Sequence, residues 1–225
     1  MIKILTENMR VKYILFFGLA ITAMFVFAIH NGHEPILGSL DVYMFRFINQ
    51  GMQSPVLNSL AATASDIGSN DMNVIIYVLS LCSIILIISI IRDSRELKNV
   101  AIVLLIALFI SGLIIGPLKM IFGVSRPYVY LDNVHVYSDG RWLDIIGESD
   151  KRDSFPSGHA TITFTVLGVL WMYNRLRIPA IVFLFMIMIL IVYVGQHYVS
   201  DIIAGGVIGF SIGYLVRRFY FLQNV

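Results

Sequence analysis

Long stretches without charged residues are the feature of this chain that most restricts its fold. Only 13% of its 225 residues are charged and 58% are hydrophobic, whereas about a quarter of a typical soluble domain is charged. A helix needs about 20 apolar residues to cross about 30 Å of hydrocarbon. We therefore expect an all-α polytopic membrane protein, a single domain over residues 1–225, in which six transmembrane helices form a bundle. The predicted spans are residues 13–31, 72–91, 99–118, 157–174, 178–195 and 198–217.

The first apolar stretch could instead be a signal peptide. Basic residues precede it, and Val26-Phe27-Ala28 loosely resembles a cleavage site. However, its apolar run exceeds the roughly 7–15 residues of a signal-peptide core. We expect it to be retained as a membrane anchor.

The distribution of lysine and arginine predicts the orientation, because these residues favour cytoplasmic loops. With the N-terminus inside, ten of the 16 basic residues fall in inner segments. We expect a plasma-membrane protein with both termini in the cytoplasm. The formal net charge is only +2 and the basic residues are scattered, so nucleic acid is not an expected partner. The sequence gives no indication of the oligomeric state.

Three polar clusters lie at the ends of apolar stretches. They are Lys119 with Arg126, then Ser157-Gly158-His159, then His197 with Asp201. In the predicted topology all three emerge on the extracytoplasmic side. Two imidazoles, a carboxylate, a hydroxyl and two cations would meet at one membrane face, and this inventory suits chemistry on a phosphate group.

The third cluster predicts a nucleophile. His197 and Asp201 are four residues apart, so one helical turn brings them to the same face. The carboxylate could hold one ring nitrogen as N–H and leave the other free to attack phosphorus. It would also stabilise the positive charge of the phosphohistidine.

The other two clusters predict the phosphate site. Ser157 and Gly158 begin a helix, whose exposed N–H groups and positive dipole end favour an anion. His159 is placed to protonate the leaving group and later to activate water. Lys119 and Arg126 would clamp the phosphate oxygens.

The segment between the first two spans predicts two short interfacial helices. Leu40, Met44, Phe47 and Ile48 recur at helical spacing, and Pro55 could start the second helix. These helices could cover the bundle or form a lip that guides a lipid headgroup into the site. The charged loop at 123–155 is expected to be a solvated cap. No repeated ligand spacing indicates a metal, and no cofactor is expected.

These motifs resemble the phosphatidic acid phosphatase type 2 superfamily, which also includes vanadium haloperoxidases. The family signature is Lys-x6-Arg-Pro, Pro-Ser-Gly-His and Ser-Arg-x5-His-x3-Asp. The first two are intact from Lys119 and from Pro156, and His197-Tyr-Val-Ser-Asp201 matches the end of the third. The resemblance implies that His197 is the nucleophile, His159 the acid and Asp201 the orienting carboxylate. It also implies that Lys119, Arg126 and Ser157 hold phosphate, and that no metal takes part.

The chain departs from the signature six residues before the nucleophile, where Ile191 replaces the arginine. A loop cation could take over, with Arg152 favoured over Lys151 and Arg141 because it lies just before Pro156. Alternatively, the substrate needs less clamping, or the protein is weakly active.

The leading interpretation is a membrane phosphatase acting on a lipid phosphate or an isoprenoid pyrophosphate. A lipid-linked phosphotransferase using the same histidine and a non-catalytic lipid-binding relative are the alternatives. A haloperoxidase is disfavoured because the motifs sit at bilayer boundaries.

Overall fold

The computed structural model describes residues 34–223, with gaps at 69–70, 139–140, 146–151 and 172. The predicted first span, residues 13–31, lies outside the described residues. Among those described, Arg95–Tyr130 and Val199–Phe221 are helical stretches long and apolar enough to cross a bilayer. The prediction of a mostly helical membrane protein is confirmed in this coarser form.

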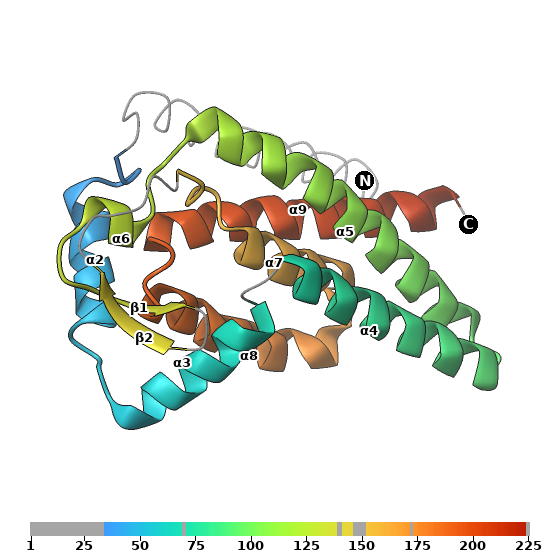
Figure 1. Ribbon diagram of the computed structural model, residues 1–225. Coiled ribbons are helices and arrows are strands. Elements are labelled where there is room, and N and C mark those ends of the chain that lie inside the picture. Colours follow the sequence, from blue (N-terminus) through green and yellow to red (C-terminus); the bar gives the residue numbers. More distant parts are fainter. Residues whose placement is uncertain (1–33, 69–70, 139–140, 146–151, 172, 224–225) are drawn as a thin grey trace.

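Four long helices and the shorter α7 account for most of the described chain and lie alongside one another (Figure 1). They are α4 (Asp71–Ile91), α5 (Arg95–Phe122), α7 (Gly158–Leu170), α8 (Asn174–Tyr193) and α9 (Val199–Gln223). The elements that cover one end of them are α2 (Ser39–Asn49), α3 (Pro55–Gly68), α6 (Pro127–Tyr130), β1 (Val134–Ser138) and β2 (Arg141–Ile145).

Local sequence signals explain where α5 begins and ends. The hydroxyl of Ser94 caps its N-terminus by accepting a hydrogen bond from the backbone of Leu97. Gly123 ends the helix with a φ of 55°, in the left-handed region that glycine adopts without a steric penalty. Lys119 lies in the last turn, where a cation interacts favourably with the helix dipole.

A β-hairpin corrects the all-α prediction and the expectation of a solvated loop. β1 and β2 pair antiparallel, with Val134 opposite Ile145. Val134 and Val136 are almost completely buried, at 0% and 1% exposure. Their alternation is the period-two signal of a strand with one buried face, which the charged residues of the loop obscured.

The helices expected near Leu40 and at Pro55 are present as α2 and α3. The buried face of α2, however, contains Asp41, Phe45 and Asn49, whereas Phe47 is 62% exposed. Polar residues turn inward here because their side chains find hydrogen-bond partners inside the protein. Asn49, for example, donates to the backbone oxygens of β1 and α8.

The closest helix pair, α7 and α9, packs through glycine. A Cβ built on Gly209 would lie 2.0 Å from the backbone oxygen of Thr161 on α7, a separation that no side chain could accept. The missing side chain therefore lets the two backbones approach closely. This pair sets the position of the helix starts at Ser157 and Val199.

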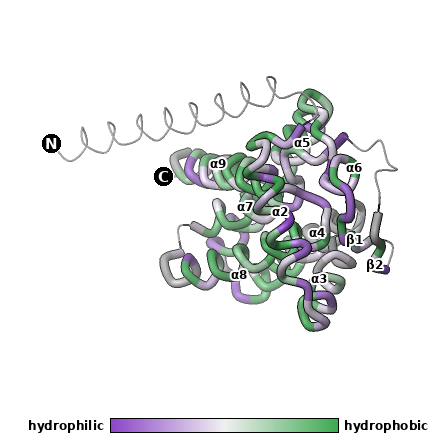
Figure 2. The backbone as a smooth tube through the Cα atoms, turned by 90° about the vertical axis from the view of Figure 1, so that its left-hand side faces the viewer, coloured by the Kyte–Doolittle hydropathy of each residue, from purple (hydrophilic) through white to green (hydrophobic). Residues whose placement is uncertain are grey.

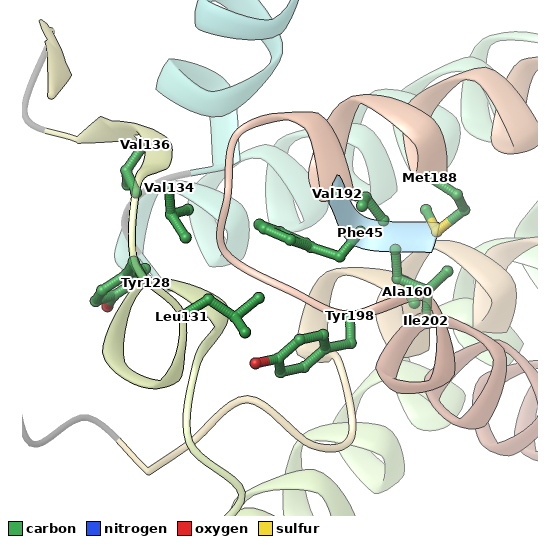
Figure 3. Packing of buried hydrophobic residues seen from close by; sticks show 10 residues of the cluster. All are labelled: Phe45, Tyr128, Leu131, Val134, Val136, Ala160, Met188, Val192, Tyr198 and Ile202. Atoms are coloured by element: carbon green, nitrogen blue, oxygen red, sulfur yellow. The ribbon is translucent and has the colours of Figure 1, made fainter. Parts of the chain in front are cut away.

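A hydrophobic cluster joins the covering elements to the long helices (Figure 3). Within it, the rings of Phe45 and Tyr198 make an edge-to-face contact at 5.7 Å. The cluster comprises Phe45, Tyr128, Leu131, Val134, Val136, Ala160, Met188, Val192, Tyr198 and Ile202. It anchors α2, α6 and β1 against α7, α8 and α9 beside the turn that contains His197.

Candidate active site

The three polar clusters predicted from the sequence meet at one end of the helices. The end of α5, the start of α7 and the turn between α8 and α9 all lie at the end covered by α2, α6 and the hairpin (Figure 1). Seen from that end, hydrophilic stretches lie between α5, α6 and α2 (Figure 2). Residues far apart in the sequence thus share one polar region in a mostly apolar molecule.

His197 lies in the turn between α8 and α9 and is 1% exposed. Gly195 makes this turn possible, because its φ is 82° and an added Cβ would lie 2.7 Å from the backbone oxygen of His135. His197 Nδ1 lies 3.4 Å from Oδ2 of Asp201, which is in the first turn of α9. Since Nδ1 faces the carboxylate, Nε2 is the ring nitrogen left for chemistry.

The second histidine is close to the first. The ring centroids of His159 and His197 are 6.4 Å apart, with an interplanar angle of 68°. A phosphorus atom between the rings could be within reach of both. Burial, together with the positive charges of Arg126 and Lys119, holds the pKa of His197 well below its usual range. The imidazole of His197 is therefore neutral at pH 7.

The start of α7 faces Lys119. A Cβ on Gly158 would lie 3.9 Å from Lys119 Nζ, so the ammonium lies beside the exposed end of the helix. The hydroxyl of Ser157 caps this helix by accepting from the backbone of Ala160. The backbone of Ser157 also donates to the backbone oxygen of Asp201 at 3.0 Å, which ties the start of α7 to that of α9.

Arg126 is fixed by two side chains that the sequence reasoning did not select. Its Nε and Nη2 donate to the two carboxylate oxygens of Asp153 at 2.7 and 2.9 Å. Its Nη1 donates to Gln196 Oε1 at 3.0 Å. Lys119 Nζ lies 3.9 Å from the same carboxylate, so Asp153 bridges both predicted phosphate-binding cations.

The ionised state of Asp153 follows from this pairing. Partial burial opposes ionisation, but the hydrogen bonds and positive charge of Arg126, with the charge of Lys119, lower the pKa of Asp153 to about 2. Asp153 is therefore negative throughout the physiological range.

Asp201 is fully buried and held by groups besides His197. Its Oδ2 accepts hydrogen bonds from Ser154 Oγ at 2.6 Å and from the backbone of Tyr198 at 2.8 Å. The sequence reasoning did not select Ser154, because no local pattern distinguishes it from a solvated serine. Ser154 positions the carboxylate that faces His197.

Asp41 is a second unselected residue that stabilises this region. Its carboxylate accepts hydrogen bonds from both the backbone and the hydroxyl of Ser200, the residue next to Asp201. It also accepts from the backbone of Leu37. A buried carboxylate on α2 thus holds the first turn of α9, and only the tertiary structure reveals this contact across 159 residues.

Two positions bear on the missing third-motif arginine. Ile191 is partly buried and packs against the hydrophobic cluster around Phe45. Arg152 is exposed, and its predicted role in the clamp stays a prediction. The loop residue that pairs with Arg126 is its acidic neighbour, Asp153.

No group of three or more metal-ligating side chains is found among the described residues. The chemistry that the described site can perform rests on its imidazoles, its carboxylates and its two cations.

Known proteins resemble this chain in sequence and in fold. The model of the PAP2 superfamily matches residues 100–224, which include every predicted catalytic residue. A lipid A 1-phosphatase of Rhizobium johnstonii is 36% identical over 98 residues, which cover 42% of this chain and 37% of that relative's own length.

Two crystal structures share the fold. The "first transmembrane PAP2 type phosphatidylglycerolphosphate phosphatase" from Bacillus subtilis has a TM-score of 0.62 and 22% identity, covering 93% of this chain and 94% of that one. Aquifex aeolicus LpxE has a TM-score of 0.59 and 21% identity, covering 80% and 95%.

Proposed function

The chain belongs to the PAP2 superfamily, and from the geometry of its site we propose that it is an integral membrane phosphatase. Its substrate is a lipid phosphate or a polyprenyl pyrophosphate, cleaved at the extracytoplasmic face. The observation that carries this proposal is the 6.4 Å separation of the His159 and His197 rings beside two cations. The named phosphatases among the similar proteins support the substrate class.

In the first step, Nε2 of His197 attacks the terminal phosphorus. A nitrogen–phosphorus bond forms as the bond to the lipid oxygen breaks, and protonated His159 gives its proton to that oxygen. Asp201 holds the imidazole in the reactive tautomer and stabilises the positive charge that develops. Lys119 and Arg126 stabilise the charge on the other phosphate oxygens.

In the second step, water attacks the phosphohistidine. His159, now neutral, takes a proton from the water while the nitrogen–phosphorus bond breaks. The released phosphate and the free imidazole restore the starting state. This sequence needs no metal, so activity should persist in a chelator.

The membrane arrangement is part of the proposal. Residues 1–225 form one domain with six spans and cytoplasmic termini, so that the ends of α5, α7 and α9 nearest the site face outward. The exposed apolar side chains of α2, such as Tyr43 at 70% and Phe47 at 62%, would contact lipid at the interface. This placement brings the site to the depth of lipid headgroups.

Phosphate release from a panel of lipid phosphates and polyprenyl pyrophosphates, measured on detergent-solubilised protein, tests the function. The wild type should release phosphate in the presence of EDTA. His197→Ala should lose at least about three orders of magnitude in turnover, as expected for a covalent nucleophile. Retained turnover in His197→Ala would reject the nucleophile. Transfer of the phosphoryl group by the wild type to an added lipid alcohol, in place of phosphate release, would identify a phosphotransferase.

Ile191 supports one second candidate, a weakly active relative that mainly binds lipid phosphates. The apolar packing of Ile191 leaves position 191 without positive charge. Binding of the panel lipids with no phosphate release by the wild type would favour this candidate over the enzyme.

A further inference from the structure

Asp153 occupies the place where a phosphate would be expected to bind. Its two oxygens accept the paired N–H groups of Arg126 at 2.7 and 2.9 Å, and Lys119 lies 3.9 Å away. A planar carboxylate and two oxygens of a phosphate present similar acceptors to a guanidinium. The structure therefore holds an internal anion on the predicted phosphate clamp.

The donors of Arg126 are largely committed to the protein. The Nε–Nη2 edge, one of the two edges of a guanidinium that can pair with two oxygens, pairs with Asp153, and Nη1 on the other edge donates to Gln196. A phosphate can pair with Nε and Nη2 together only if Asp153 leaves them. The side chain of Arg126 is 14% exposed and that of Asp153 is 46% exposed, so the carboxylate is the partner free to turn toward solvent.

The charges of Lys119, Arg126 and Asp153 indicate that a phosphate and the Asp153 carboxylate would compete for the same two cations. Lys119 and Arg126 contribute two positive charges, and Asp153 removes one of them. Ile191 adds none where the family signature has an arginine. A ligand that displaces Asp153 must therefore offer more negative charge than a single carboxylate.

We propose that Asp153 is a specificity-determining residue, an internal competitor that only a terminal phosphate can displace. A phosphate monoester carries about −1.5 to −2 at pH 7, whereas a phosphodiester carries a single negative charge. Abundant phosphodiester lipids bring their phosphates to the same membrane depth but gain little by exchanging with a carboxylate. Asp153 thus prevents bulk phospholipid from binding to Lys119 and Arg126 but lets the substrate bind.

This inference rests on the proposed function, and anion binding tests it separately. Binding of inorganic phosphate and of dimethyl phosphate would be measured by calorimetry on the full chain in detergent. The wild type should prefer inorganic phosphate by roughly tenfold or more, since one charge-assisted contact is worth about that factor. Equal affinities in the wild type would overturn the proposal without any substitution.

Asp153→Asn then removes the competing charge. It should bind both anions more tightly, by roughly three- to tenfold, with a larger gain for dimethyl phosphate. Asp153→Glu keeps the charge and should retain the wild-type preference. Asp132→Asn, an exposed carboxylate outside the site, is the matched control and should change neither affinity.

Weaker or unchanged phosphate binding by Asp153→Asn would reject the competitor and identify Asp153 as a residue that only positions Arg126. Failure of the proposed function would give a different result from failure of the competitor role of Asp153. In that case the wild type releases no phosphate from any lipid, while the anion-binding preferences still report on Asp153.

Discussion

Helix α9 presents two different surfaces to its neighbours. Toward α7 it is close-packed, and Gly209 lets the backbones nearly touch. Toward α8 it borders an apolar groove of about 700 Å³, lined by residues of α2, α7, α8 and α9. Gly206 lies on the groove side, less than one turn from Gly209.

The difference shows which helix contact fixes the positions of the predicted site residues. The α7–α9 contact carries the starts of both helices, and Ser157 hydrogen-bonds to the backbone of Asp201 across it. The groove is lined by apolar side chains. The first surface positions the predicted site residues Ser157 and Asp201, so substitutions on the two surfaces should have unequal effects.

The largest expected effect comes from a matched pair of glycine substitutions. Gly209→Ala places a Cβ 2.0 Å from a backbone oxygen that cannot move independently, so stability should fall by about 1–3 kcal/mol or more. A displacement on the order of 1 Å at the site would also cost roughly 100-fold in turnover. Thermal unfolding and phosphate release in detergent would measure both.

Gly206→Ala is the control for Gly209→Ala. Its Cβ would meet the ring of Phe164 at 3.3 Å, and that ring can shift toward the groove. Stability should change by less than about 0.5 kcal/mol. Equal losses in the two variants would erase the proposed distinction between the surfaces.

A smaller effect should follow from Ser154→Ala, which removes one donor to the buried Asp201 carboxylate. Hydrogen bonds to charged groups are worth about 1.5–3 kcal/mol, or roughly ten- to a hundredfold in turnover. The loss should fall on kcat more than on KM, because Ser154 acts on the group behind the nucleophile. Ser154→Thr keeps the hydroxyl and should recover most of the activity; a loss confined to KM would contradict this role.

The smallest expected effect is the pH dependence of stability, which should come from His197 and not from the apolar groove. His197 has a pKa well below its unfolded value of about 6.5, chiefly because of burial and then the charges of Arg126 and Lys119. The free energy of unfolding is therefore highest above pH 6.5 with respect to this group. It decreases below pH 6.5, because His197 is protonated in the unfolded chain but stays neutral in the folded one. One such proton contributes at most about 1.4 kcal/mol per pH unit.

Unfolding temperatures between pH 7.5 and 5 would measure this slope. His197→Gln should flatten it, whereas Ile203→Ala, in the groove, should leave it unchanged because no lining residue there titrates in this range. Asp153 contributes in a separate window: its stabilisation is present above pH 3.8 and decreases toward pH 2. An unaltered slope in His197→Gln would show that another group controls it.

The resemblance of the motifs to the PAP2 family was confirmed, and the structure brings the predicted residues to one end of the helices. The spacing of four residues predicted that His197 and Asp201 lie close together, and they do, although His197 lies in the turn before α9 and only Asp201 is helical. Spacing could not predict Ser154 or Asp41, because a serine or a buried aspartate has no local signature that distinguishes it from a solvated one. The hairpin was missed because its charged neighbours outweighed the alternation of Val134 and Val136.

The sequence by itself determined the environment of the chain and its reactive groups: long apolar stretches predict a membrane protein, and the motifs supply two histidines, a carboxylate and two cations. Tertiary structure decided how those groups are paired. Only packing could place Asp153 on Arg126 and the carboxylate of Asp41 on Ser200, because each contact joins segments whose separation along the chain no local pattern encodes. The sequence gives the charge of each side chain. Which side chain it pairs with depends on which segments the tertiary structure brings into contact.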